Sequence, residues 1–393
     1  MKRLNLLYAG TLPPHPGGSA IVGYQLVEGL ARRGYRIRSI APAITELLSC
    51  GDSFARNHPE LRITRFQVPS YDDSPDRGRS DAYHELEGRG LRCVFGEVIR
   101  ECRPDIVIAG RESMMRHLGD ELTRLELPSL VIAHGALMYG LSKGALTPQQ
   151  ENDLRRKLKK SGAIVAVAEH LGAQMRAIGF DRVRVIKNGV DRNRFAPRPK
   201  SASLMRQLAI ADDALTITFV GNLKPIKRVL DIVAAAPDIL RAIPNAIFLI
   251  VGDGVMRAQI EDACHSTGVL DRFRFTGWIE RDAIPKYMSL ADVVVMPSES
   301  EGLSLASLEA MASGRTVVAS DIPAARELIV DGETGLLFRK GDIAHLAATI
   351  VKAADPDLRA RIGNAAHAST ARFDIEHSID AYENLLAELI PRE

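Results

Sequence analysis

The stretch SESEGLSLASLEAMASG occupies residues 298–314 and lies between two apolar runs, ADVVVMP at 291–297 and TVVAS at 316–320. Runs of this length, rich in β-branched residues, predict strands. Leu305, Leu308 and Ala312 recur at i, i+3 and i+7, which predicts a helix over about 304–313 with these residues on its apolar face. Glu309 would lie at the edge of that inward face. The whole segment therefore predicts a βαβ crossover.

The loop at the start of this stretch is predicted to bind a ligand. Open α/β sheets bind ligands at the carboxyl ends of their strands, where this loop begins. Glu301 and Glu309 would line that edge, although each could also be a simple surface or capping carboxylate. Gly302, Leu303 and Ser304 would offer backbone N–H groups at a helix N-terminus, where anions bind well.

Composition restricts the class of protein. The chain has 393 residues, 46% of them hydrophobic and 25% charged, which is typical of a soluble protein with two domains. The net charge of +2 argues against a general nucleic-acid binder. The longest apolar runs, such as AIFLIVG at 246–252, are too short to span a bilayer. Four cysteines without metal or C-x-x-C spacing indicate free, mostly buried thiols in a reducing compartment.

Strand and helix patterns alternate along the chain in two series. Strands are predicted at 4–9, 35–41, 63–68, 105–109, 129–134, 163–168 and 183–186, and then at 215–221, 246–252, 272–277, 292–297, 316–320 and 335–338. The polar, turn-rich segment 188–203 separates the two series. The predicted fold class is α/β, with two doubly wound, Rossmann-like domains facing each other across a cleft. We place an N-terminal domain at 1–190, a second domain at 191–375 and a C-terminal helix at 376–393, and leave open whether this helix packs back on the N-terminal domain.

Three further loops follow strands and could contact a ligand. VGNLKPIKR at 220–228 places Lys224, Lys227 and Arg228 before a helix, which suits a diphosphate or, alternatively, a solvated basic loop. Gly17 and Gly18 follow the first strand, where a plain glycine turn is equally compatible with the sequence. IAHGALMYG at 132–140 puts His134 at the end of a strand, and IVGDGV at 250–255 forms a turn. The basic run RRKLKK at 155–160 is typical of a solvated helix face, with an anionic partner as the alternative.

The sequence PSESEGLSLASLEAMASG, followed by TVVASDIPAARELIVDGETGLLF, resembles the retaining glycosyltransferases of the GT-B fold, in particular glycosyltransferase family 4. Glu301 and Glu309 match the E-x7-E spacing of that family. NGVD with Phe195 is similar to its interdomain segment, and the Gly17–Gly18 pair to its N-terminal loop. The likeness covers nearly the whole chain and is stronger in the second half.

The resemblance implies a transferase that moves a sugar from a nucleoside-diphosphate sugar, UDP before GDP, to a hydroxyl group with retention. It implies that Glu309 binds the ribose hydroxyls and that Lys227 stabilises the leaving diphosphate. No protein nucleophile is implied. The other residues implied to bind the donor are His134 near the donor sugar, Glu301 with Gly302, Leu303 and Ser304 at the sugar and phosphate, Gly17 and Gly18 at the phosphates, and Gly221 with Asn222 in the loop before Lys227.

Two positions depart from the family pattern. Asn222 stands where an arginine is usual, and Arg228 follows Lys227 where glycine is usual. We hypothesise that Lys224 or Arg228 replaces the missing cation. No metal site or cofactor is expected, because the only Asp-x-Asp match, Asp355-Pro-Asp357, is predicted to be a turn or helix start.

Other functions remain open at this point. A nicotinamide-dependent oxidoreductase would need a G-x-G-x-x-G motif, which neither half has after its first strand. A nucleotide-sugar epimerase of GT-B fold and a non-catalytic nucleotide-sugar-binding protein are the closer alternatives. The acceptor is a sugar, a lipid-linked glycan or a small molecule, chosen by loops such as 69–82 and 136–148. We expect a cytoplasmic protein and leave open a peripheral contact with the inner membrane face.

Overall fold

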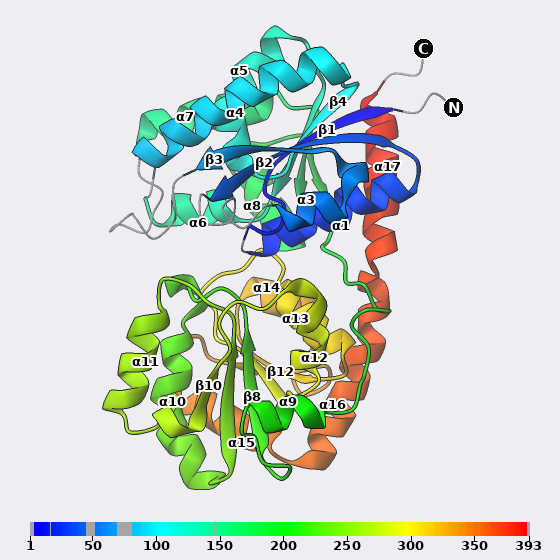
Figure 1. The fold of residues 1–393 in the computed structure, drawn as a ribbon. Helices are drawn as coiled ribbons and strands as arrows, with labels where there is room; N and C mark the ends of the chain where they lie inside the picture. Colours follow the sequence, from blue (N-terminus) through cyan, green and yellow to red (C-terminus); the bar gives the residue numbers. More distant parts are fainter. Residues whose placement is uncertain (1–3, 16, 45–51, 69–80, 145, 391–393) are drawn as a thin grey trace. The chain divides into compact units, whose positions relative to one another are not determined.

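The structure is a computed structural model that describes residues 4–15, 17–44, 52–68, 81–144 and 146–390. It divides into two compact units, an N-terminal unit of residues 1–188 and 378–393 and a C-terminal unit of residues 189–377. Each unit has its own parallel sheet with helices on it (Figure 1). The prediction of an α/β fold with two Rossmann-like domains is therefore confirmed.

The sheet of the N-terminal unit has the strand order β3-β2-β1-β4-β5-β6-β7. All described pairings in it are parallel, and β1 lies between β2 and β4, with Leu6 opposite both Ile37 and Ile106. Its strands are β1 (Asn5–Ala9), β2 (Arg36–Ile44), β3 (Ile63–Val68), β4 (Ile106–Ala109), β5 (Ser129–Ala133), β6 (Ala163–Ala166) and β7 (Val183–Val185).

Helices of the N-terminal unit fill the connections between these strands. They are α1 (Gly18–Arg32), α3 (Ser53–Asn57), α4 (Asp81–Cys102), α5 (Glu112–Arg124), α6 (Ala136–Ser142), α7 (Pro148–Lys159) and α8 (Glu169–Ala177), with a 3-10 turn η1 (Pro59–Leu61). Of the two loops predicted to choose the acceptor, 69–80 lies outside the described residues, and 136–148 contains α6.

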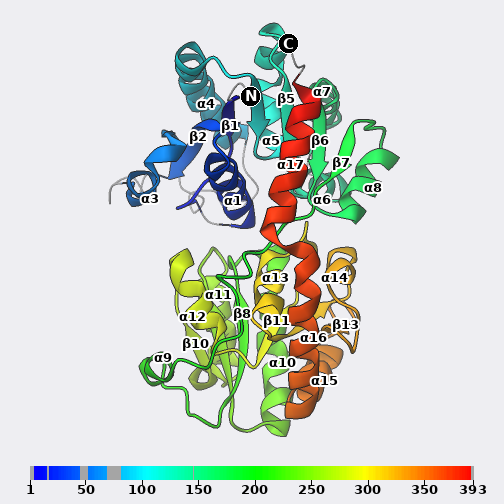
Figure 2. The same ribbon diagram turned by 90° about the vertical axis from the view of Figure 1, so that its right-hand side faces the viewer.

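The last helix, α17 (Ile375–Leu389), leaves the C-terminal unit and runs along the N-terminal unit (Figure 2). Its Ile379 packs so closely on Gly29 of α1 that a Cβ at that glycine would lie 2.8 Å from the isoleucine. Arg33 donates to Asp380 at 2.6 Å and to Glu383 at 2.5 Å. Apolar packing and these ion pairs fix the C-terminal end of the chain on α1.

The sheet of the C-terminal unit has the strand order β10-β9-β8-β11-β12-β13 and is also parallel. Every residue of β8, β9, β11 and β12 is buried, as continuous apolar runs covered on both faces require. The strands are β8 (Leu215–Val220), β9 (Ala246–Val251), β10 (Phe273–Phe275), β11 (Val293–Met296), β12 (Thr316–Ser320) and β13 (Leu336–Phe338).

Helices cover this sheet in two groups, because α10 contacts α11 and α15, whereas α13 contacts α16. They are α9 (Ala202–Gln207), α10 (Val229–Ala242), α11 (Arg257–Ser266), α12 (Ile284–Met288), α13 (Leu305–Ala312), α14 (Pro323–Leu328), α15 (Ile343–Ala353) and α16 (Pro356–Ser369), with 3-10 turns η3 (Pro225–Lys227), η4 (Leu270–Arg272), η5 (Arg281–Ala283) and η6 (Thr370–Phe373). The Asp355-Pro-Asp357 match begins α16, since the Asp355 side chain caps its N-terminus.

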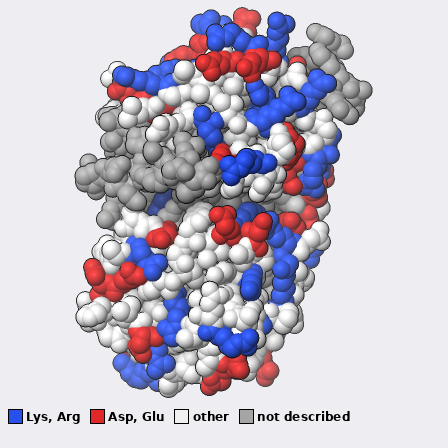
Figure 3. Space-filling model, viewed as in Figure 1, with Lys and Arg blue, Asp and Glu red and all other residues white. Residues whose placement is uncertain are grey.

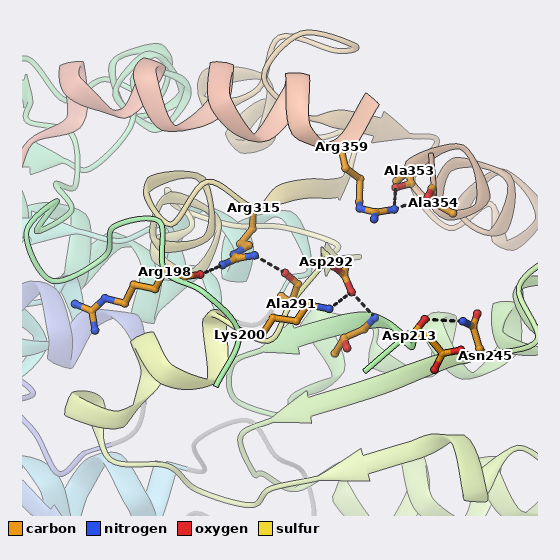
Figure 4. A network of polar contacts seen from close by, with 11 residues as sticks. Arg198, Lys200, Asp213, Asn245, Ala291, Asp292, Arg315, Ala353, Ala354 and Arg359 are labelled. Atoms are coloured by element: carbon orange, nitrogen blue, oxygen red, sulfur yellow. Dashed lines mark hydrogen bonds and ion pairs between the residues drawn. The ribbon is translucent and has the colours of Figure 1, made fainter. Parts of the chain in front are cut away.

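The segment before α9 is bound to the amino-terminal edge of this sheet (Figure 4). The guanidinium group of Arg315, just before β12, donates to the carbonyl oxygen of Arg198 at 2.6 Å. Asp292, just before β11, accepts from Lys200 at 2.6 Å. These contacts leave the opposite, carboxyl-terminal edge to the loops predicted to bind the donor.

Three general features of the described residues were also expected or relevant from the sequence: helix length, cysteines and surface charge. Among the described residues, no helix is long and apolar enough to cross a membrane. The described cysteines, Cys93, Cys102 and Cys264, are free thiols as expected, but only Cys264 is buried, so the expectation that they are mostly buried is wrong. On the face shown in Figure 3, acidic and basic side chains of the C-terminal unit are interspersed.

Candidate active site

The loops after β8 and β9 stack on each other and require glycine. A Cβ at Gly252 would lie 2.1 Å from the carbonyl oxygen of Gly221, and one at Gly254 would lie 2.4 Å from the Asn222 side chain. Both glycines have φ values, 132° and 152°, that favour glycine. The backbone N–H of Leu223 donates to the carbonyl oxygen of Asp253 at 2.8 Å. Asn222 therefore lies against the β9 loop, where only a glycine at position 254 leaves room for its side chain.

Lys227 and Glu301 meet at the carboxyl-terminal edge of the sheet. Lys227 lies in the turn after β8, and Glu301 lies in the loop after the neighbouring strand β11. The Lys227 Nζ is 2.5 Å from Oε1 of Glu301. The two loops are also joined by a backbone hydrogen bond of 2.8 Å from Glu299 to Ile226. Two residues 74 positions apart are thus held together as one charged pair.

The helix after this loop begins as the sequence predicts. Ser304 caps α13, its hydroxyl accepting from the backbone N–H of Ser307 at 3.2 Å. Gly302 and Leu303 precede it, so this backbone leads directly into the N-terminus of a helix of eight residues. The prediction of a single apolar face is wrong, however, because α13 is buried on nearly every side. Ala306 is its only residue that is not buried.

Glu309 is a buried carboxylate on α13, with a fractional exposure of 8%. Its Oε1 lies 3.4 Å from Nη1 of Arg281, at the start of η5. Burial raises the pKa of Glu309, while the positive charges of Arg281 and Arg194 lower that pKa. Arg194, in the segment that enters the unit, forms an ion pair with Asp282. Two arginines from different segments thus oppose the cost of burying this carboxylate.

The remaining predicted site residues belong to the N-terminal unit. His134 follows β5, and its Nε2 lies 3.0 Å from the carbonyl oxygen of Gly110, after β4. Because a carbonyl oxygen can only accept, Nε2 must carry the proton, and Nδ1 is then the acceptor nitrogen of a neutral ring. Burial lowers the pKa of His134 and Arg111 lowers it further, while Glu112 and the bond to Gly110 oppose the shift. The lowered pKa favours the neutral ring of His134, whose Nδ1 can accept a hydrogen bond.

Gly17 and Gly18 lie at the start of α1, on the same sheet edge as His134. Gly17 has a φ of 116° and occupies the N-cap position, and Gly18 is exposed as the first helical residue. A Cβ at Gly17 would meet nothing within 4 Å, so this glycine is required by backbone conformation and not by crowding.

The structure thus brings the predicted residues together in two groups. Gly221, Asn222, Lys227, Glu301, Gly302, Leu303, Ser304 and Glu309 share one sheet edge of the C-terminal unit, while His134, Gly17 and Gly18 share one sheet edge of the N-terminal unit. The sequence analysis did not identify Ser298, Arg281 or Arg194. Only Ser298 had a local signal, since it stands three residues before Glu301.

The basic run at 155–160 lies on α7 and the residue after it, and its charges are largely paired. Arg155 pairs with Glu151, and Lys157 is 2.8 Å from Asp153 and donates to the carbonyl oxygen of Arg116 at 2.9 Å. This agrees with a solvated helix face bound by local ion pairs.

Comparison with known proteins identifies the class. The model for glycosyl transferases group 1 matches residues 201–369, and the model for glycosyltransferase family 4 matches residues 16–194. Together with the two parallel-sheet units, these matches define a GT-B glycosyltransferase. The chain belongs to glycosyltransferase family 4.

Three proteins illustrate the likeness. The 2-deoxystreptamine N-acetyl-D-glucosaminyltransferase of Streptomyces fradiae is 33% identical over 51% of each chain. The N-acetyl-alpha-D-glucosaminyl L-malate synthase of Bacillus anthracis is 24% identical over 97% of this chain and 96% of its own. The structure of Anabaena Alr3699/HepE in complex with UDP-glucose has a TM-score of 0.79 at 19% identity, covering 98% of this chain and 100% of the other. The chain spans between about half and two thirds of the first curated relatives it matches.

Proposed function

We propose that this protein is a retaining glycosyltransferase that transfers a sugar from a UDP-sugar to a hydroxyl group of an acceptor. The observation that carries the proposal is the Lys227–Glu301 pair at the carboxyl edge of β8 and β11, with the buried carboxylate of Glu309 on the following helix. A cation can bind a diphosphate, and two carboxylates can accept hydrogen bonds from the hydroxyls of a sugar and of a ribose. The UDP-glucose complex of a protein with this fold supports the choice of nucleotide.

The proposed chemistry follows from the charges. The acceptor hydroxyl attacks the anomeric carbon on the face from which the diphosphate leaves, so the configuration of that carbon is retained. The leaving phosphate oxygen accepts the hydroxyl proton. Lys227 stabilises the charge that develops on the diphosphate, which is the main catalytic effect of a preorganised cation. Glu301 and His134 would bind hydroxyls of the donor sugar, and Glu309 those of the ribose.

We also propose that no metal ion takes part and that the diphosphate is neutralised by protein cations. Lys224 is exposed on the turn before Lys227 and is the cation we assign to the role left open by Asn222. The proposed acceptor is a compound with a free hydroxyl group. A peripheral contact with the membrane is compatible with this proposal.

The first test is thermal unfolding with UDP, GDP, ADP and NAD, on the wild-type protein and on Glu309→Ala. A ligand at 100 times its Kd stabilises the folded state by about 2.7 kcal/mol. We expect a shift with UDP that the variant loses. A shift of the melting temperature with NAD alone would favour a nicotinamide-dependent oxidoreductase. No shift with any nucleotide would favour a non-catalytic protein.

A second test separates a transferase from an epimerase and examines the stereochemistry. Proton NMR of the product formed from UDP-glucose and candidate acceptors reports the anomeric configuration, and retention is expected. An epimerase would alter the donor sugar without an acceptor. The same reaction in the presence of a chelator should proceed at an unchanged rate.

A further inference from the structure

Ser298 is buried directly beneath the charged pair at the sheet edge. It lies two residues after β11, and its fractional exposure is 1%. Its hydroxyl donates to Oε1 of Glu301 at 2.6 Å. The same oxygen is 2.5 Å from Nζ of Lys227. One carboxylate oxygen of Glu301 therefore accepts from two different donors.

The other carboxylate oxygen of Glu301 has a different environment. Among the described residues, no hydrogen bond or ion pair reaches Oε2, and this oxygen is not among the buried polar atoms that lack a partner. It is therefore open to solvent and able to accept from a ligand hydroxyl. Lys227 has three N–H donors, one of which is directed to Glu301.

Lys227 alone would hold Glu301 poorly once a donor binds. A lysine ammonium is a mobile charge on a flexible stem, and a diphosphate competes with a carboxylate for it. The Ser298 hydroxyl is neutral, short and fully buried, so it does not move toward the diphosphate. The bond from Ser298 is therefore the contact that persists when Lys227 turns to the ligand.

We propose that Ser298 is a positioning residue for Glu301: it anchors Oε1 so that Oε2 accepts a hydroxyl of the transferred sugar. This inference rests on the proposed function and adds to it a residue that acts on the sugar and not on the nucleotide. The backbone of the loop is fixed independently, by the hydrogen bond from Glu299 to Ile226. Loss of the hydroxyl should therefore free the carboxylate without moving the loop.

The test compares Ser298→Ala with wild type for binding of UDP and of UDP-glucose by calorimetry, followed by kcat and KM for the donor. UDP lacks the sugar, so its Kd should change by less than about twofold. The Kd of UDP-glucose should rise about tenfold or more, as expected for a lost hydrogen bond to a charged group. Ser298→Thr keeps the hydroxyl and should recover part of the loss.

Ser289→Ala is the matched control, because Ser289 is also buried in this unit and donates to the carbonyl oxygen of Lys286 at 2.7 Å. It should lower the melting temperature as Ser298→Ala does, with both Kd values unchanged. If wild type binds no nucleoside diphosphate, the proposed function fails and takes this inference with it. If wild type binds UDP but Ser298→Ala weakens UDP and UDP-glucose equally, or weakens neither, the role of Ser298 alone is wrong.

Discussion

The carboxylate of Glu309 lies 3.4 Å from the guanidinium group of Arg281, in a site where burial raises the pKa of the acid. The residue is proposed to accept two ribose hydroxyls, and only the ionised form can accept from both without donating. Burial therefore favours the protonated form of Glu309, whereas the proposed function requires the ionised form. Arg281 and Arg194 are the cations that favour the ionised form.

We expect Glu309→Gln to keep or raise the stability of the ligand-free protein while abolishing the nucleotide effect. The folded pKa is raised above the unfolded one, so the ionised side chain costs stability at pH values above that range. A neutral amide avoids this cost. Thermal unfolding at pH 7.5 with and without UDP measures both effects. Glu333→Gln, at an exposed position, should change neither, and a large loss of stability in Glu309→Gln would contradict the argument.

Replacing Arg281 should make nucleotide binding depend on pH. In Arg281→Gln the pKa of Glu309 rises further, because one of its two opposing cations is lost, while Arg194 remains paired with Asp282. The affinity for UDP should fall as the pH is lowered and recover as the pH is raised, measured by calorimetry over a series of pH values. Arg241→Gln, on an exposed arginine, is the control. A loss that is equal at every pH would mean that Arg281 contacts the nucleotide directly.

His134 should remain neutral at pH values below the usual pKa of histidine. The lowered pKa implies that the folded protein does not take up this proton near pH 6.5, whereas the unfolded chain does. Stability contributed by the neutral ring is therefore present above about pH 6.5 and falls as the pH decreases below it. NMR of the imidazole nitrogens, with His134→Gln for assignment, should show Nε2 protonated and a low titration midpoint. A midpoint above 6.5 would contradict this.

The strands were predictable because the sequence carries a strong local signal for them. Each predicted strand overlaps an observed one, since strands covered on both faces are continuous apolar runs between turns. The extent of burial was less predictable. The pattern of α13 suggested one apolar face, yet small residues such as Ala310 allow close packing on the other sides as well.

The site was predictable only where it depends on strand ends. Glu301 and Lys227 each follow a strand, but their pairing depends on β8 and β11 being neighbours in the sheet. Eight elements lie between these two strands in the sequence, so the sequence does not show that they are neighbours. Arg281 reaches Glu309 from a 3-10 turn that no periodicity marks. Strand order decides which side chains meet across a sheet edge, and local sequence patterns do not predict strand order.

The backbone conformation at Arg228 explains why glycine is usual at this position. We predict that two substitutions of Arg228 differ in stability. Its φ is 50°, a left-handed conformation, and it donates to the buried Asp231 at 2.8 Å and 3.1 Å. Arg228→Ala loses these bonds and keeps the strain, whereas Arg228→Gly loses the bonds and relieves it. The glycine variant should be more stable by about 1 kcal/mol in denaturant unfolding. Equal stabilities would show that the conformation is not strained.

The same variants test which cation supports the diphosphate. Lys224 is exposed on the turn that leads to Lys227, whereas Arg228 forms an ion pair with the buried Asp231. Lys224→Ala should therefore reduce turnover more than Arg228→Ala does, and Lys227→Ala should reduce it most. Initial rates with a UDP-sugar at saturating acceptor measure this order. If Lys224→Ala and Arg228→Ala both leave turnover intact while Lys227→Ala abolishes it, neither residue replaces the arginine missing at Asn222.

Three glycines, Gly10, Gly23 and Gly110, surround Tyr8 in the core of the N-terminal unit. We expect that a larger residue at any of these positions destabilises the protein. A Cβ at Gly23 would lie 2.1 Å from the Tyr8 hydroxyl oxygen, and one at Gly110 would lie 2.2 Å from it. Tyr8 is fully buried, and its hydroxyl donates to the carbonyl oxygen of Thr11 at 3.2 Å. Gly23→Ala should therefore overpack this site and destabilise the protein by about 1–3 kcal/mol.

A double-mutant cycle checks whether the clash is with that hydroxyl. Tyr8→Phe removes the oxygen atom and one hydrogen bond, so alone it should cost about 1 kcal/mol. Combined with Gly23→Ala it should recover part of the loss, because the ring carbon would still lie 2.8 Å from the added Cβ. Denaturant unfolding of the four proteins measures the coupling. Strictly additive costs would mean that the carbonyl oxygen of Thr11, 2.8 Å from the added Cβ, and not the Tyr8 hydroxyl, limits the size of residue 23.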